Sequence, residues 1–299
     1  MKSVRTLLHS IIDYAGLFPP AGLAMFPAVR NYAAYLAGNA FWMLGRFILP
    51  VARLEEFETA ASDLLPRNPD ATPWRLSVLA GTDLDAEIMQ ILAFNTRHAS
   101  GSKQGMAIID TIEIKTADVA AIHTAVERIP GTLTAYVEIP LNAEIESLIA
   151  ALDEAGTRAK VRTGGLSSEM FPATDDLLHF MHACVRAEVP FKATAGLHHP
   201  LRSVHRLTYE PHSESAMMHG FLNVFLAAAF LSEGMDRNLA GELIEETSLE
   251  AFHFSNDGIA WREHWLDNEA LARARQLAIS FGSCSFQEPI DDLEALGLL

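Results

Sequence analysis

Short apolar runs that read as buried strands carry charged or polar side chains at every second position. Four such runs follow one another, at residues 109–116, 134–140, 159–164 and 191–196. Because side chains alternate across a strand, polar residues two apart share a face. The pairs are Glu113 and Lys115, Tyr136 and Glu138, Lys160 and Arg162, and Lys192 and Thr194. A helix-covered parallel sheet is buried on both faces, so these charges predict a shared polar centre.

The strand-like runs alternate with helical patterns, which predicts βα units and a parallel sheet. One of the expected helices spans Ala143 to Ala155. Eight βα units over about 250 residues are typical of a closed (β/α)8 barrel of the TIM type. The open doubly wound sheet is the competing fold, but the expected first strand is not followed by its glycine-rich turn. The eight expected strands lie at residues 46–51, 74–80, 108–115, 133–139, 160–163, 191–195, 251–255 and 277–281.

The organisation predicted from this alternation is a single domain. Residues 1–45 precede the first expected strand and are interpreted as an N-terminal cap, residues 46–285 as the barrel, and residues 286–299 as a C-terminal helix. The cap contains the segment Asp13–Leu23, DYAGLFPPAGL, whose glycines and prolines are typical of a turn. On this interpretation Asp13 has a functional role only if the segment folds over the open end of the barrel.

Composition narrows the class of protein and of partner. The chain has 299 residues and a formal net charge of −16, which disfavours nucleic acid and acidic lipid as partners. Its longest apolar run, residues 221–231, is shorter than the roughly 20 residues that span a bilayer. Cys184 and Cys284 have neither metal-ligand nor redox spacing. We therefore expect a cytoplasmic protein that binds a small anionic molecule in a local basic pocket, and a homo-oligomer remains open.

The barrel fold predicts where the active site lies. Active sites of these barrels form at the carboxyl ends of the strands, so polar residues late in each strand carry the most weight. Glu113, Lys160 and Lys192 are expected one layer deeper. The alternative is that these charges only pair with one another and fill the barrel. The residues expected nearest the mouth are Lys115, Glu138, Arg162, Thr194 and His198.

The most specific short motif is PFKATAGLHHP, residues 190–200. Its Lys192, Thr194 and Gly196 resemble the Schiff-base strand of deoxyribose-phosphate aldolase and related class I aldolases of barrel fold, in which that lysine lies on the sixth strand. Gly282–Ser285 is similar to the loop with which those barrels hold a substrate phosphate. The resemblance implies a lyase in which Lys192 forms the imine. The family's second lysine is missing from the expected seventh strand, and Glu138 or Asp110 matches its carboxylate only loosely.

The residues themselves also favour Lys192 as a nucleophile. A desolvated lysine beside other cations has a lowered pKa, and Lys160 and Arg162 are expected on the adjacent strand. Glu138 is then the group that moves protons, and His198 is a proton donor or substrate partner. The alternative for Lys192 is a salt bridge to Glu138 or Glu113.

An anion site is expected where Arg162 meets the turn formed by Gly164 and Gly165. The guanidinium matches a carboxylate or phosphate, and glycines let backbone N–H groups approach closely. Lys115, Thr194 and Ser283 complete the expected substrate contacts.

Histidines offer a metal site as an alternative. His198, His199 and His219, together with Glu138, are potential ligands of a divalent ion. None of them has the spacing that identifies a metal site from sequence, so no cofactor is expected.

The predicted function is a barrel enzyme for a small phosphorylated or carboxylated metabolite, with lyase chemistry as the first choice. A metal-dependent hydrolase or isomerase and a non-catalytic ligand-binding barrel are the alternatives.

Overall fold

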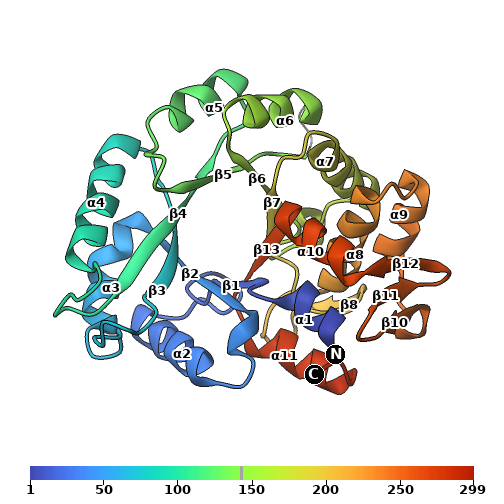
Figure 1. The fold of residues 1–299 in the computed structure, drawn as a ribbon, viewed down its shortest axis with the longest axis horizontal. Coiled ribbons are helices and arrows are strands. Elements are labelled where there is room, and N and C mark those ends of the chain that lie inside the picture. Colours follow the sequence, from blue (N-terminus) through green and yellow to red (C-terminus); the bar gives the residue numbers. More distant parts are fainter. Residues whose placement is uncertain (142–143) are drawn as a thin grey trace.

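The chain folds into a closed barrel of eight parallel strands with helices outside it (Figure 1). The structure is a computed structural model that describes residues 1–141 and 144–299. The strands follow the order β1-β13-β7-β6-β5-β4-β3-β2 around the barrel. The predicted (β/α)8 fold is confirmed.

Between residues 44 and 194, strands and helices alternate as expected. The barrel strands are β1 (Ile12–Tyr14), β2 (Leu44–Pro50), β3 (Trp74–Leu79), β4 (Ala107–Lys115), β5 (Thr134–Glu138), β6 (Arg158–Arg162), β7 (Phe191–Thr194) and, at the end of the chain, β13 (Ala278–Ser283). The helices are α1 (Lys2–Leu8), α2 (Met25–Ala37), α3 (Leu54–Ala61), α4 (Leu84–Arg97), α5 (Val119–Val126), α6 (Ile145–Glu154) and α7 (Thr174–Arg186). Ala143, the expected start of α6, lies outside the described residues.

Two expected strand assignments are wrong. The N-terminal segment is more than a cap, because Ile12–Tyr14 is itself a barrel strand that pairs with β13 and β2. The expected seventh strand near residues 251–255 is β10 (Phe252–Phe254), an edge of a small antiparallel sheet outside the barrel. The barrel therefore begins at Ile12 rather than at residue 46. A three-residue strand such as β1, Ile-Asp-Tyr, is too short to show the alternation by which longer strands are recognised.

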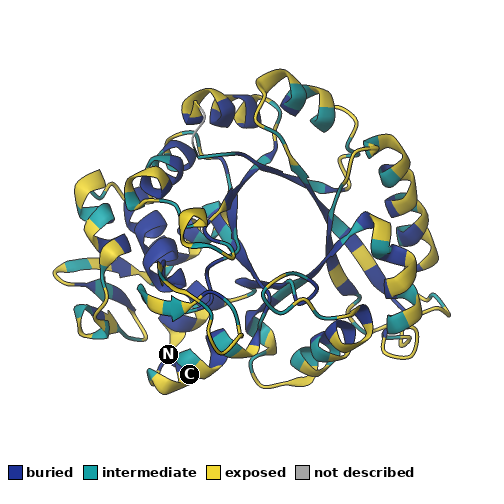
Figure 2. Ribbon diagram, turned by 180° about the vertical axis from the view of Figure 1, so that it is seen from behind, coloured by how far each residue is buried: buried dark blue, intermediate teal, exposed yellow. Residues whose placement is uncertain are grey.

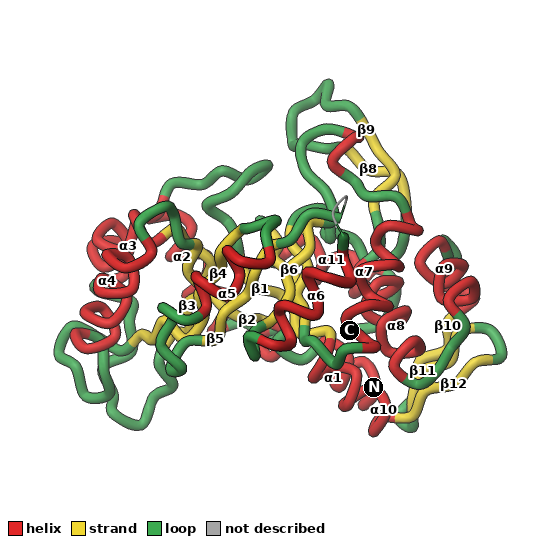
Figure 3. Tube along the Cα trace, turned by 90° about the horizontal axis from the view of Figure 1, so that it is seen from above, coloured by secondary structure: helices red, strands yellow, loops and turns green. Residues whose placement is uncertain are grey.

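Between β7 and β13 the chain adds elements that the simple alternation does not predict. The hairpin of β8 (Ser203–Arg206) and β9 (Ser215–Met218) stands out beyond the barrel on one side (Figure 3). It is followed by α8 (Phe221–Ser232) and α9 (Arg237–Glu245), and then by the sheet of β10, β11 (Gly258–Trp261) and β12 (His264–Asp267). The last helices are α10 (Asn268–Leu277) and α11 (Gln287–Ala295).

Helix starts and burial follow from the sequence. Asp83, Asp118 and Asp267 each accept a hydrogen bond from a backbone N–H in the first turn of α4, α5 and α10, which satisfies a group that the helix leaves free. Most outer helices bury one face and expose the other, whereas α8 is buried over residues 221–231 and most residues of the barrel strands are buried (Figure 2). None of the helices within the described ranges combines the length and the apolar character needed to cross a membrane.

Candidate active site

Five charged side chains of alternating sign form a buried series inside the barrel, which we call the charge ladder. It runs Asp13, Lys192, Glu113, Lys160, Glu138. The Lys192 ammonium lies 2.6 Å from Asp13 and 2.8 Å from Glu113. The Lys160 ammonium lies 2.8 Å from Glu113 and 2.9 Å from Glu138. Every carboxylate in the ladder thus contacts a lysine, and each lysine contacts two carboxylates.

Strand register brings the ladder together. Glu138 pairs with Lys160 across β5 and β6, and Lys160 pairs with Lys192 across β6 and β7, so the three side chains lie side by side on the inner face. The prediction that these residues share the inner face of their strands is confirmed, because their charged groups contact one another or share Glu113 as a partner. Asp13, on β1, closes the series from the other side of β7 and was not predicted to lie there.

Neutral donors also bind the carboxylates of Asp13 and Glu113. The Ser280 hydroxyl donates to Asp13 at 2.8 Å, and the Ser77 hydroxyl donates to Glu113 at 2.6 Å. The backbone N–H of Arg46 donates to the other oxygen of Asp13 at 2.8 Å. Gly45 makes room for that oxygen, since a Cβ on Gly45 would lie 2.3 Å from it. Buried charges are expensive without such partners, so these contacts fix the ladder in place.

The charge pairs outweigh burial in setting the ionisation of the ladder. Burial alone raises the pKa of the Glu113 carboxyl, but Lys160 and Lys192 reverse this and hold the pKa well below its usual range. Burial lowers the pKa of the Lys192 ammonium. Asp13 and Glu113 raise this pKa by more than burial lowers it, so the net pKa is raised. The predicted lowered pKa of Lys192 is therefore wrong. Its neighbours within contact are carboxylates, not the cations that the sequence suggested.

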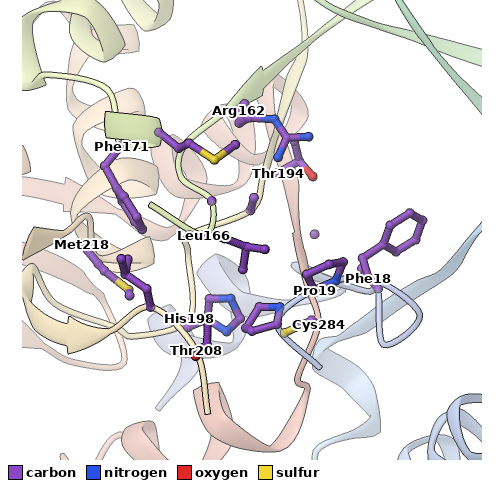
Figure 4. A pocket seen from close by; sticks show the side chains of 18 of the residues that line it. Phe18, Pro19, Arg162, Leu166, Phe171, Thr194, His198, Thr208, Met218 and Cys284 are labelled. Atoms are coloured by element: carbon purple, nitrogen blue, oxygen red, sulfur yellow. The ribbon is translucent and has the colours of Figure 1, made fainter. Parts of the chain in front are cut away.

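A cavity of about 310 Å³ opens above the ladder at the carboxyl ends of the strands (Figure 4). Glu113 and Lys160 form part of its lining, although they are only 3% and 4% exposed, whereas Lys192, at 1%, does not line it. Lys160 and Lys192, which both lie on barrel strands, thus differ in their access to the cavity. Lys160 faces the space where a ligand fits, and Lys192 lies behind it in the sealed part of the barrel.

The other predicted site residues differ in whether they line the cavity. Glu138 is buried beside Lys160, and Ser283 is buried against the Nδ1 atom of His198 at 3.4 Å. Lys115 is exposed and lies 3.7 Å from Glu138. The predicted residues that line the cavity are Lys160, Arg162, Gly165, Thr194 and His198.

Gly164 is a point of close approach between two loops. A Cβ there would lie 2.7 Å from the Cα of Gly196 and 2.6 Å from the Phe171 ring. The loop after β6 therefore contacts the loop after β7 through Gly164 and Gly196. The loop after β6 also carries Phe171, which lines the cavity. The glycines of the RTGG segment serve this packing, in addition to any anion contact.

Two arginines reach the cavity from different elements. Arg162, on β6, has a 44% exposed side chain and lies 3.5 Å from Glu138. Arg206 comes from the end of β8 in the projecting hairpin. Arginine pairs well with carboxylate or phosphate, so these side chains provide local positive charge in an acidic protein. Sequence reasoning missed Arg206, because the hairpin lies outside the βα alternation.

A second polar group lies on the opposite wall, around the C-terminal helix α11. His198 contacts Glu288 at 2.9 Å, and the Tyr209 hydroxyl donates to the same carboxylate at 3.4 Å. Tyr209 also lies 3.7 Å from the Cys284 sulfur. Burial raises the pKa of the Cys284 thiol, which makes it a poor nucleophile. Glu288 and Tyr209 were not predicted, because nothing in the sequence places α11 beside the mouth.

The proposed metal ligands do not gather in one place. The Nε2 atom of His219 is bonded to the carbonyl of Pro172, and His199 pairs with Asp292 and stacks on His205. Over residues 1–141 and 144–299, no group of three or more histidine, cysteine or carboxylate side chains is arranged to hold a metal ion. The alternative based on Glu138, His198, His199 and His219 thus gains no support from their positions.

Comparison with known proteins adds no family to this description. Neither a protein-family model nor a curated protein matches the chain.

Proposed function

We propose that the protein is an enzyme of the lyase type that forms an imine between Lys160 and the carbonyl group of a small anionic metabolite. The observation that carries this proposal is the position of Lys160. It is the ladder lysine that lines the cavity, and it contacts two carboxylates able to move protons. Lys192, the lysine favoured by the sequence motif, has no access to a substrate and a raised pKa.

The corrected strand count supports the same assignment. With β1 as the first strand, Lys160 lies on the sixth strand, Lys192 on the seventh and Glu113 on the fourth. In the aldolases that PFKATAGLHHP resembles, the Schiff-base lysine is on the sixth strand, a second lysine is on the seventh, and a carboxylate is on the third or fourth. The lysine that seemed to be missing from strand seven is Lys192. The strand positions of that family are therefore met better when Lys160 takes the nucleophilic role, although the motif that resembles its Schiff-base strand surrounds Lys192.

The ladder suits each step of imine formation. Lys160 passes a proton to Glu138, 2.9 Å away, and the free amine attacks the carbonyl carbon. The resulting carbinolamine loses one water molecule, whose departure needs a proton returned by a carboxyl group. The protonated imine carries the same single positive charge as the ammonium it replaces. Its contacts with Glu113 and Glu138 are therefore preserved, and they stabilise it.

The proton transfer has an opposing electrostatic cost. Burial raises the pKa of the Glu138 carboxyl, but Lys160, Arg162 and Lys115 outweigh burial and the net pKa is lowered. An anionic substrate group that engages Arg162 draws one of these cations away from Glu138. Substrate binding then makes Glu138 a better base at the moment when it is needed.

Reductive trapping tests the proposal directly. The protein is incubated with carbonyl compounds bearing a carboxylate, a phosphate or neither, and sodium borohydride is added. We expect the peptide that contains Lys160 to gain the mass of the reduced adduct. Lys160→Met should abolish this gain, and Lys103→Met, on an exposed lysine, should leave it unchanged. Labelling at another lysine, or at none with every compound, would overturn the proposal.

A further inference from the structure

We infer that the substrate is a 2-oxo acid with an apolar side chain, such as an aryl or branched alkyl group. This inference rests on the proposed function and specifies its substrate class. Three properties of the cavity carry it: the spacing of Arg162 from Lys160, the apolar part of its lining, and the way in which the loop after β13 uses its polar groups.

The spacing of the two cations favours a carboxylate next to the carbonyl. Lys160 and Arg162 lie two apart on β6, so their side chains share its inner face. They contact different oxygens of the same carboxylate, that of Glu138, at 2.9 and 3.5 Å. A substrate carbon held at the Lys160 amine therefore has Arg162 within reach of its neighbouring carbon. In a 2-oxo acid, that neighbouring carbon is the carboxylate.

The apolar part of the cavity lining favours a hydrophobic body on the substrate. It comes from the loop after β6 and the hairpin on one side of the cavity and from the loop after β1 on another side (Figure 4). A sugar carries a hydroxyl on nearly every carbon, and each hydroxyl buried without a partner costs free energy. An aryl or branched alkyl group instead gains from burial against such a surface. The apolar side chains of the lining used here are Phe18, Pro19, Leu166, Phe171, Leu207 and Met218.

The loop after β13 is poorly suited to the phosphate that the sequence resemblance implies. The backbone N–H groups of Ser285 and Glu288 donate to the hydroxyls of Ser283, at 3.3 Å, and Ser285, at 3.1 Å, so both of these donors are used within the loop. The Ser283 hydroxyl also contacts His198. The side chains that face the cavity here are Cys284 and Glu288. A carboxylate at this wall repels a phosphate, which leaves the arginine side of the cavity for the anion.

The size of the cavity agrees with this substrate class. Its volume of about 310 Å³ lies at the lower end of the range for small-molecule sites. Arg206 reaches the cavity from the hairpin, near Leu207, so the hairpin offers both a positive charge and an apolar contact. A compact molecule with one anionic end and one apolar end satisfies both.

Competition among four trapping reagents tests the inference. The reagents are 2-oxo-3-phenylpropanoate, pyruvate, phenylacetaldehyde and glyceraldehyde 3-phosphate, each at the same concentration with borohydride. We expect the phenyl oxo acid to label Lys160 at least about 10-fold faster than pyruvate, because an apolar pocket discriminates by the groups it buries. Faster labelling by glyceraldehyde 3-phosphate, or equal labelling by pyruvate, would overturn the inference and leave the proposed function standing. Labelling by none of the four would count against the proposed function itself.

Matched variants separate the carboxylate contact from the reactivity of the carbonyl. Arg162→Gln should slow labelling by the phenyl oxo acid roughly 10-fold or more and leave labelling by phenylacetaldehyde, which lacks a carboxylate, within about twofold. Arg128→Gln, on an exposed arginine beyond α5, is the control and should change neither. Equal slowing of both reagents by Arg162→Gln would show that Arg162 acts on Glu138 or on the fold, and it would overturn the carboxylate assignment.

Discussion

The Asp13 end and the Glu138 end of the charge ladder contain the same residue types but differ in their access to the cavity. At the Asp13 end, Lys192 is sealed between Asp13 and Glu113 and does not line the cavity. At the Glu138 end, Lys160 lines the cavity, and Glu138 is linked to the exposed Arg162 and Lys115. The strand on which a barrel lysine lies therefore does not show whether that lysine is a nucleophile or a structural cation. The boundary of the cavity decides between the two roles.

The largest expected effect is on stability, from removing the sealed lysine. Lys192→Met leaves Asp13 without a lysine partner and Glu113 with one fewer, and breaking a buried pair in this way costs about 3–5 kcal/mol. Lys160→Met should cost less, because Glu113 keeps Lys192 and Glu138 keeps its contacts with Arg162 and Lys115. Urea unfolding of both variants measures the difference.

The double variant Asp13→Asn with Lys192→Met serves as the control for that experiment. It removes the uncompensated charge and should recover part of the lost stability. If Lys160→Met proved the more destabilising of the two single variants, the division of the ladder into a structural and a chemical part would be wrong.

The next largest effect is expected on the rate of borohydride labelling of Lys160 when Glu138 is changed. Glu138→Gln removes the carboxylate that takes the Lys160 proton but keeps the shape of the side chain. Loss of a general base typically lowers a rate by 10²- to 10⁴-fold, so we expect borohydride labelling to slow by about that factor. Single-turnover labelling followed by mass spectrometry measures it. An unchanged rate would assign the proton transfer to Glu113 instead.

Stability should depend on pH in a way that the ladder sets. The pKa of Glu113 is lowered by folding, so its contribution is present above the unfolded value of about 4.3 and is lost as pH falls toward the folded value. The pKa of Lys192 is raised, so its contribution is present below about 10.4 and is lost as pH rises through the folded value.

Between these limits the ladder should give a flat stability profile. Urea unfolding from pH 3 to pH 11 should therefore show falling stability at both ends. Glu113→Gln should weaken the dependence on the acid side. An acid limb that kept its slope in Glu113→Gln would assign acid sensitivity to other carboxylates, such as Asp110 between Arg46 and Arg75.

The smallest effect is expected at the exposed end of the ladder. The Lys115 side chain is 75% exposed and lies 3.7 Å from Glu138, which is typical of a surface pair of little energetic value. Lys115→Gln should lower stability by no more than about 0.5 kcal/mol. Its labelling rate should stay close to that of the parent, in contrast to Arg162→Gln. A large loss in Lys115→Gln would extend the functional part of the ladder beyond the cavity.

Much of the fold and part of the candidate site could be predicted from the sequence. Strand parity correctly grouped Glu138, Lys160 and Lys192, because the alternation of side chains is a local property. Asp13 could not be placed, since its strand is short and is separated from Lys192 by 179 positions. Arg206 and Glu288 reach the site from a hairpin and a terminal helix whose positions depend on tertiary packing. The ionisation of Lys192 was misjudged for the same reason, because its nearest carboxylate came from the missed strand.

The position of β1 also affects how the chain folds during synthesis. β1 pairs with β13 on one side and β2 on the other, so the barrel stays open until residue 283 has emerged from the ribosome. Until then, Ile12–Tyr14 lacks one of its two neighbouring strands. Contacts between such distant parts of a chain form late and slow the overall reaction. Closure of the barrel by β13 is therefore expected as a late step, and it completes the surroundings of Asp13 at the base of the site.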